Sequence, residues 1–211
     1  MSARADPSAV PLLIACALRI ERAALGGGRA PGGSAVLRTG MGPRAADRAV
    51  ARALERPGME RAAVLATGFC AGLVPGMNPG DLVVAEETRD PRGAVACTAT
   101  ALLAEALSRA VPGRTVHTGA LTGSDHVVRG QERDRLRAGG AIAVDMESAA
   151  TLWTASGAGR PVAAVRVIVD APEHELVRIG TVRGGISAFR VLRAVLPAFY
   201  DWHRSLPLSR R

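Results

Sequence analysis

The sequence lacks lysine altogether and contains few aromatic residues. Its 27 strongly basic residues are all arginine, and with 19 acidic residues they give a net charge of +8. A basic chain of this kind can bind nucleic acid. However, the arginines are scattered along the chain, and aromatic residues, on which single strands stack, make up only 3% of it. We therefore do not expect nucleic acid as a partner.

Cysteine is also scarce. Cys16, Cys70 and Cys97 are far apart, and they form no metal-ligand spacing with the four histidines. This pattern favours neither a disulfide framework nor a metal site. We expect three reduced, structural cysteines, no metal and no cofactor.

Long apolar runs are absent as well. No run reaches the roughly 18 residues of a membrane-spanning helix, and the first ten residues, "MSARADPSAV", lack the apolar segment of a secretory signal. We expect a cytoplasmic protein with a disordered head at 1–10, one domain at 11–205 and a basic tail at 206–211. The final amphipathic helix and Arg204, Arg210 and Arg211 are suited to contact anionic lipid headgroups, but a helix packed on the sheet with a solvated end is the favoured explanation of the same residues.

Apolar runs of strand length alternate with segments of helical spacing, which is the pattern of an α/β fold with a central mixed sheet. Strands are predicted over residues 11–18, 34–40, 62–68, 80–87, 114–123 and 161–170, with another ending at Val144. Helices are predicted over 42–58, 98–113, 131–140, 147–156 and 186–205. Pro197 is expected to kink the last helix.

Three predicted strand ends are unusual, "ATGFCAG", "AVDMES" and "VIVD", because apolar residues are followed at once by glycines or an acid. Ligands of α/β proteins gather at strand ends. Gly68 and Gly72 suit either a close ligand or a tight turn. Asp170 suits a helix cap or a catalytic acid, and His174 is a second candidate acid or base. Glu21, just past the first strand, decides nothing by itself.

Together these features have a recognisable order. An acid after the first strand, a glycine-rich strand end, an Asp-Met-Glu strand end and a strand finishing in Asp resemble the nucleoside phosphorylase and nucleosidase superfamily over roughly residues 11–175. The most specific pieces are "VDMESAA" and "TGFCAGLVPGMNPGDLVV", with "GSDHVV" and "RVIVD" in the expected order. The resemblance implies one three-layer α/β/α domain with a mixed, partly barrel-like sheet, a nucleoside substrate and a homodimer that completes its sites at or near the interface.

The resemblance also implies roles for single residues. Glu21 would activate water, Asp170 would protonate the purine at N7, and Glu147 would bind the ribose hydroxyls while Met146 packs under the sugar. The substrate would also contact Gly68, Phe69, Cys70, Val127 and Val128. Cleavage through an oxocarbenium-like state needs negative charge near the sugar and a proton for the base, which these residues supply. Asp145 is expected to cap or support the helix that follows it.

The nucleophile and the 5′ substituent are less sharply indicated. Phosphorylases of this superfamily keep an arginine just before the glycine-rich strand end, where this chain has Ala66, so we expect water to be the nucleophile. Phosphate remains the alternative nucleophile, because Arg19 or Arg44 could bind it.

Among the hydrolytic relatives, the chain looks most like the hopanoid-associated nucleosidase that releases adenine from adenosylhopane. The alternatives are methylthioadenosine/S-adenosylhomocysteine nucleosidase and futalosine hydrolase. Two residues depart from the sequence patterns of these relatives. Val127 stands where the methylthioadenosine enzymes have an aromatic residue, and Val169 stands where a serine commonly precedes the catalytic aspartate. A non-catalytic nucleoside- or lipid-binding protein is the alternative of another class.

Overall fold

The computed structural model describes residues 10–26, 34–172 and 181–207, with only the backbone given for 181–186. Most of the expected head, His174, and Arg210 and Arg211 of the expected tail lie outside these ranges. Within the described ranges, none of the helices has the length and apolar character that crossing a bilayer requires.

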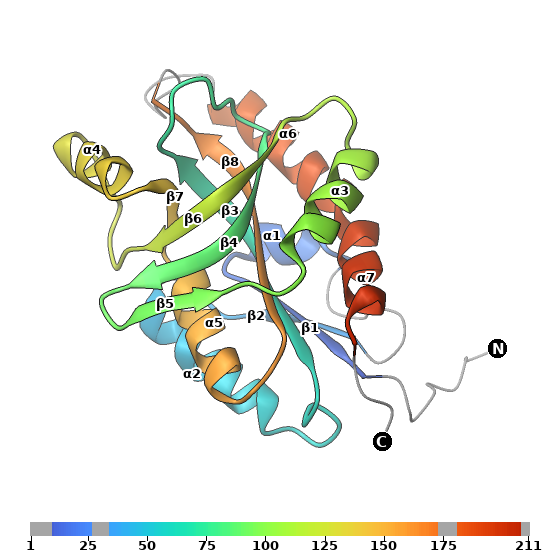
Figure 1. Cartoon of the computed structure of the whole chain (residues 1–211). Coiled ribbons are helices and arrows are strands. Elements are labelled where there is room, and N and C mark those ends of the chain that lie inside the picture. The colour runs from blue at the N-terminus through green and yellow to red at the C-terminus, as the bar shows by residue number, and fades with distance from the viewer. Residues whose placement is uncertain (1–9, 27–33, 173–180, 208–211) are drawn as a thin grey trace.

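Eight strands form one mixed sheet, and five of them close into a barrel. The sheet runs in the order β2-β1-β3-β7-β6-β4-β5, and β8 joins β3 to β4 and so closes the ring (Figure 1). The predicted mixed, partly barrel-like sheet is confirmed. The strands are β1 (Leu12–Cys16), β2 (Ala35–Arg38), β3 (Ala63–Gly72), β4 (Leu82–Asp90), β5 (Gly93–Ala96), β6 (Val116–Gly123), β7 (Ala141–Asp145) and β8 (Val162–Asp170).

The helices cover both sides of this sheet. They are α1 (Arg19–Ala24), α2 (Pro43–Leu54), α3 (Thr100–Ala110), α4 (Gln131–Ala138), α5 (Ser148–Gly157), α6 (Thr181–Ala194) and α7 (Leu196–Ser205). Helices α2 and α5 lie together on one side, while α1, α3, α6 and α7 lie on the other, and α4 projects at the edge beyond β6 and β7 (Figure 1).

Two predicted boundaries were wrong for local reasons. The last helix is not one kinked helix but two, which meet at Val195, because Pro197 lacks an amide hydrogen and suits the first turn of a new helix. Strand β3 does not end at Gly68 but continues to Gly72, because its parallel pairing with β8 extends to Ala71 and its antiparallel pairing with β7 includes Gly72. A further short strand, β5, pairs with β4 through a turn at Pro91 and was not predicted.

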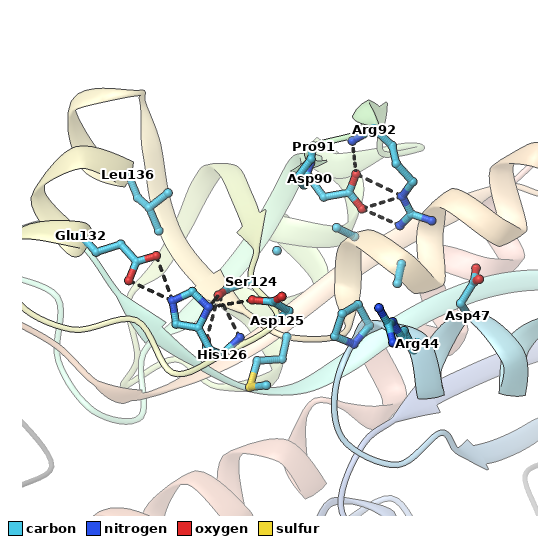
Figure 2. A pocket seen from close by; sticks show the side chains of 15 residues that line it. Arg44, Asp47, Asp90, Pro91, Arg92, Ser124, Asp125, His126, Glu132 and Leu136 are labelled. Atoms are coloured by element: carbon cyan, nitrogen blue, oxygen red, sulfur yellow. Dashed lines mark hydrogen bonds and ion pairs between the residues drawn. The ribbon is translucent and has the colours of Figure 1, made fainter.

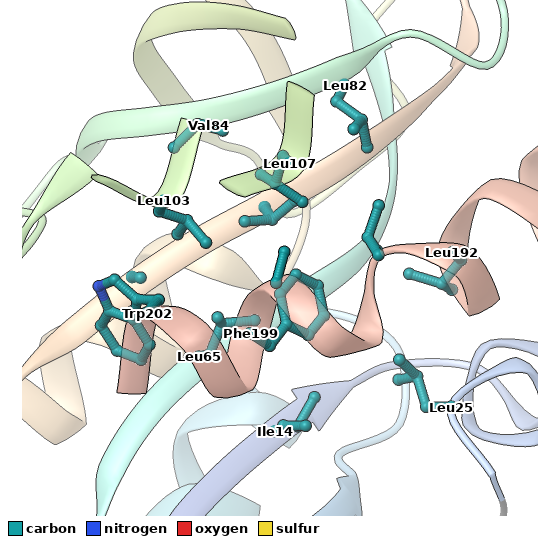
Figure 3. Packing of buried hydrophobic residues seen from close by; sticks show 14 of the residues in the cluster. Ile14, Leu25, Leu65, Leu82, Val84, Leu103, Leu107, Leu192, Phe199 and Trp202 are labelled. Carbon is teal, nitrogen blue, oxygen red and sulfur yellow. The ribbon is translucent and has the colours of Figure 1, made fainter. Parts of the chain in front are cut away.

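The core follows from the alternation of side chains along the strands. Leu12 and Ile14 of β1 face α1, α3, α6 and α7, whereas Leu13 and Ala15 face α2 and α5. Figure 3 shows the first of these clusters, in which Phe199 of α7 lies among aliphatic side chains from the sheet and from α3. Ala198, Phe199 and Trp202 of α7 are buried there, so the apolar face of that helix packs on the sheet and is not available to a membrane.

We expect Phe199→Ala to lower the free energy of unfolding by about 3–5 kcal/mol, because it empties a fully buried site in this cluster. The matched control is Leu102→Ala on α3, where the leucine is 51% exposed; it is expected to change stability by less than about 0.5 kcal/mol. Urea denaturation of the three proteins measures both values. Equal losses in the two variants would contradict the assignment of this cluster as the core.

Candidate active site

A pocket of about 360 Å³ lies where β1, β7 and β8 reach their carboxyl ends beside the second half of β3. Polar groups at such strand ends are the usual location of ligand sites in α/β proteins. The pocket walls contain eight of the residues selected from the sequence, namely Glu21, Phe69, Cys70, Val127, Val128, Met146, Glu147 and Asp170. Segments that are distant along the chain therefore meet in one cavity, and Gly68 lies directly behind it.

Glu21 is the most firmly held carboxylate of the pocket. It lies in the first turn of α1 and is only 2% exposed. Its Oε2 accepts hydrogen bonds from the amides of Ala17 (2.9 Å) and Leu18 (2.8 Å), and its Oε1 accepts one from the amide of Phe69 (2.9 Å). These three bonds fix the carboxylate between the end of β1 and the middle of β3.

Gly68 leaves the space that this carboxylate occupies. Its φ is +136°, and a Cβ at this position would lie 2.5 Å from Oε1 of Glu21 and 2.6 Å from Nη1 of Arg166. The glycine is therefore required by close approach of two side chains inside a strand, whereas the sequence suggested a turn or a ligand.

Glu147 follows β7 directly and lies at the start of α5. It is 9% exposed, and its Oε1 accepts a hydrogen bond of 2.8 Å from the amide of Gly42. Burial raises the pKa of the Glu147 carboxyl, although the nearby Arg166 guanidinium opposes this effect. Met146, beside it, lines the same pocket.

Arg166 is a site residue that sequence reasoning missed. Its side chain is 1% exposed; Nε lies 2.5 Å from Oδ2 of Asp145 and donates to Oγ of Ser148 at 2.8 Å, and Nη1 donates to the carbonyl of Thr67 at 3.0 Å. Burial would lower the pKa of this guanidinium, but the carboxylates of Asp145, Glu147 and Glu21 raise it, so it stays cationic. A signal was present, because Arg166 is the one charge inside the apolar strand before Asp170.

Asp145 has the supporting role that its sequence position indicated. Its carboxylate accepts the amide of Ser148, the first residue of α5, at 3.1 Å and 3.3 Å. The N-cap position of α5 is Glu147, so Asp145 supports the following helix through the amide of Ser148, which agrees with the prediction that it caps or supports that helix. The ion pair with Arg166 was not predicted.

Asp170 ends β8 next to an irregularity in the sheet. The register between β3 and β8 shifts at Cys70 and Ala71, so that Ala71 pairs with Asp170 and Val169 is left over. Such a bulge changes the direction of the side chains that follow it. Oδ2 of Asp170 receives a hydrogen bond of 3.1 Å from Nη1 of Arg133, while Oδ1 is buried without a partner in the described structure.

The cysteine in the pocket is not a nucleophile. Burial raises the pKa of the Cys70 thiol well above its ordinary value, and burial likewise raises that of Cys16 to about 12. A thiol must ionise to attack or to bind a metal. Nor do the described residues contain a group of three or more histidine, cysteine or acidic side chains placed to hold a metal ion.

The mouth of the pocket is apolar and exposed. Met41 and Val127 both line it, and they are 72% and 66% exposed. Met41, which lies between β2 and α2, was not selected from the sequence, where an isolated methionine in a glycine-rich loop carries no functional signal.

A second pocket of about 650 Å³ adjoins the first and shares His126 and Met146 with it. Figure 2 shows His126 between two carboxylates, and its ring nitrogens lie 2.7 Å from Asp125 and 3.0 Å from Glu132. Arg44 lines this second pocket, whereas Arg19 lines neither. Among the described residues that line the first pocket, none is an arginine.

Comparison with known proteins places the chain in a family. A model described as the phosphorylase superfamily matches residues 27–197. The chain belongs to the phosphorylase superfamily. No curated protein matches the chain.

Solved structures show the same fold at low sequence identity. An S-adenosylhomocysteine nucleosidase from Streptococcus pyogenes has a TM-score of 0.76 at 20% identity, covering 92% of this chain and 97% of its own. A futalosine hydrolase from Helicobacter pylori has a TM-score of 0.76 at 17% identity, with coverages of 93% and 99%. A 5′-methylthioadenosine/S-adenosylhomocysteine nucleosidase from S. pneumoniae has a TM-score of 0.73 at 21% identity, with coverages of 90% and 97%.

Substitution of Gly68 tests how tightly Glu21 and Arg166 pack against this position. We expect Gly68→Ala to lower the free energy of unfolding by at least about 1 kcal/mol more than Gly58→Ala, because overpacking adds to backbone strain. Gly58 also has a positive φ, +86°, but a Cβ there meets nothing within 4 Å. Urea denaturation gives the difference, and equal costs in the two variants would show that Gly68 is needed for its backbone conformation alone.

Proposed function

We propose that this protein is a purine nucleosidase, which hydrolyses the N-glycosidic bond of a 5′-modified adenosine and releases adenine. The observation that carries the proposal is the meeting of Glu21, Glu147 and Asp170 in one pocket whose described walls contain no arginine. The nucleosidases and the futalosine hydrolase that share the fold support the same class of reaction.

The charge of the site suits the proposed reaction. Three acidic groups, Glu21, Asp145 and Glu147, surround the buried guanidinium of Arg166. The excess negative charge stabilises the positive charge that develops on the sugar as the bond to the base breaks. Glu147 binds the ribose hydroxyls in this scheme, since among the described groups only one amide occupies its carboxylate, and Met146 packs under the sugar.

Water is the proposed nucleophile, and Glu21 accepts its proton. The three amides that hold Glu21 fix its carboxylate, the proposed general base, before the substrate arrives. This lowers the entropic cost of ordering the carboxylate during the reaction. A phosphate dianion would instead meet the carboxylates of the pocket, and no described arginine lines the pocket to bind it. Arg166 is paired with Asp145, Arg133 is paired with Asp170, and Arg44 lies in the neighbouring pocket. This distribution favours hydrolysis over phosphorolysis.

Asp170 supplies the proton for the departing base. It lines the same pocket as Glu21 but stands at the end of β8, whereas Glu21 belongs to α1. Protonation of the purine at N7 makes the purine a better leaving group. The two carboxyl groups therefore have opposite roles, one as the base for water and the other as the acid for the purine.

The favoured substrate is adenosylhopane, which yields ribosylhopane and adenine. The exposed Met41 and Val127 at the pocket mouth support a large apolar 5′ group, and the adjoining 650 Å³ pocket provides additional room. Methylthioadenosine, S-adenosylhomocysteine and futalosine remain the alternative substrates. The proposal includes a cytoplasmic homodimer that approaches the membrane through this mouth and the basic tail.

An adenine-release assay over a panel of nucleosides tests the function. The panel contains nucleosides with methylthio, homocysteinyl, futalosine-type and triterpenoid 5′ groups, each with and without inorganic phosphate. We expect the triterpenoid substrate to have the highest kcat/KM and phosphate to have no effect. Ribose 1-phosphate formed only with added phosphate would overturn hydrolysis, and adenine binding without cleavage of any nucleoside would identify a non-catalytic binding protein.

We expect Asp170→Asn to lower kcat by about 10²–10⁴-fold, because an amide cannot donate the proton that the base needs. Asp201→Asn is the control, since Asp201 is exposed on α7, far from the pocket along the chain. Circular dichroism verifies that both variants fold. Full turnover by the Asp170 variant would refute the proposed acid.

A further inference from the structure

The structure joins the proposed acid, Asp170, to an arginine from a different part of the fold. Nη1 of Arg133 donates to Oδ2 of Asp170 at 3.1 Å, and Nη2 donates to the carbonyl of Gly72 at 2.8 Å. The two side chains are only 11% and 19% exposed. This is therefore not a solvated surface ion pair, and the guanidinium acts on the carboxyl group with little screening.

The position of Arg133 on α4 makes this contact unusual. Helix α4 is polar, has no buried residue and projects from the edge of the sheet (Figure 1). Arg133 nevertheless extends from it to the ends of β3 and β8, where it holds one carbonyl and one carboxylate at once. A residue needed only to attach α4 could bind any backbone carbonyl, whereas this one binds the carboxyl group that the mechanism uses.

The contact leaves the carboxyl group half satisfied. Oδ1 of Asp170 and Nε of Arg133 are both buried and have no hydrogen-bond partner among the described residues. A buried polar group without a partner costs free energy, and a ligand that supplies a hydrogen-bond partner relieves that cost. One carboxyl oxygen is thus fixed by Arg133, and the other has no described protein partner, so a proton on it can be donated to an acceptor of the ligand such as purine N7.

We propose that Arg133 is a positioning residue that tunes Asp170 as the acid of the reaction. It orients the carboxyl group through Oδ2 and stabilises the carboxylate that forms when the proton leaves. The proton passes from Asp170 to purine N7 as the C1′–N9 bond breaks and its electron pair moves to the base. Water adds at C1′ and gives a proton to Glu21. Solvent then returns a proton to Asp170 and removes one from Glu21, so the cycle balances.

This inference rests on the proposed function, and it has a pH signature of its own. A guanidinium beside a carboxyl group favours the ionised form, so Arg133 assists the loss of the proton from Asp170 during the reaction. Removing the cation should therefore slow the reaction on the acidic side of the pH profile. It should also extend activity to higher pH, so that the two pH profiles cross.

Other charged or titratable groups surround Asp170 and must be separated from this effect. They are Arg166 on the same strand, Cys70 on β3, and Glu21, Asp145, His126 and Glu147 around the pocket. Burial raises the pKa of the Cys70 thiol well above its usual range, and Arg166 stays cationic. His126 is the histidine among these groups, and hydrogen bonds from its ring to Asp125 and Glu132 raise its pKa. All profiles are therefore repeated in a His126→Gln background.

The test compares Arg133→Leu, Arg133→Gln and Arg133→Lys with the wild type, measuring kcat and kcat/KM for adenine release between about pH 5 and 10. We expect Arg133→Leu to lower kcat about threefold to tenfold on the acidic side. The alkaline limb of its kcat/KM profile should move up by about one pH unit. Arg133→Gln keeps a donor for Gly72 without the charge and should behave like Arg133→Leu. Arg133→Lys keeps the charge and should retain the wild-type limb.

The matched control is Arg135→Leu, which removes an exposed arginine of the same helix and should leave both parameters unchanged. An equal loss at every pH with an unmoved limb, or no change at all, would overturn the proposal and leave Arg133 as a tether of α4. If Arg133→Leu does not fold, the comparison of the Gln and Lys variants decides the question in the same way.

Failure of the proposed function remains distinguishable from failure of this inference. If the wild type cleaves no nucleoside, the readout becomes the pH dependence of adenine binding, measured by titration calorimetry on the same variants. We expect adenine affinity to fall at high pH in the wild type, because N7 then loses its donor, and the fall should occur about one pH unit higher in Arg133→Leu. Identical binding profiles in all variants would overturn the inference on its own.

Discussion

The buried ion pair between Arg166 and Asp145 is the interaction on which the rest of the site depends. It links the middle of β8 to the end of β7, and through Ser148 and the carbonyl of Thr67 it also holds the start of α5 and the middle of β3. Removing either partner would leave an uncompensated buried charge, which typically costs about 3–5 kcal/mol. Four elements around the pocket are therefore held in register by one guanidinium.

The same guanidinium makes the accumulation of acids possible. Glu21, Asp145 and Glu147 would repel one another in a low-dielectric cavity if no cation stood among them. Arg166 balances only part of this charge, so the pocket keeps the net negative character that the proposed reaction uses. Gly68 is part of the same arrangement, because a side chain there would occupy the space of both Glu21 and Arg166.

The sequence was informative where chemistry coincides with a local pattern, and uninformative where it depends on contacts across the fold. Glu147 and Asp170 stand at or just after strand ends and Glu21 stands in the helix that follows β1, so the ordered set of motifs that resembles the superfamily selected them. The ion pairs of Arg166 and Arg133 join residues from different elements, and no spacing along the chain reveals such a partner. Local effects also made two element boundaries differ from the predicted ones. Pro197 lies in the first turn of a new helix, and after the bulge beside Val169 the β3–β8 pairing continues to Asp170.

The three proposed functional carboxyl groups differ in how the fold satisfies them, and this difference is consistent with their proposed roles. Glu21 accepts three amides and is fixed as a base must be, whereas Asp170 is held through one oxygen by a cation that stabilises its deprotonated form. Glu147 accepts a single described amide although burial raises its pKa, so most of its acceptor capacity is unused. Ribose hydroxyls are donors that can use that capacity without adding charge. One type of side chain thus serves as base, acid and sugar ligand because the surrounding backbone and arginines differ.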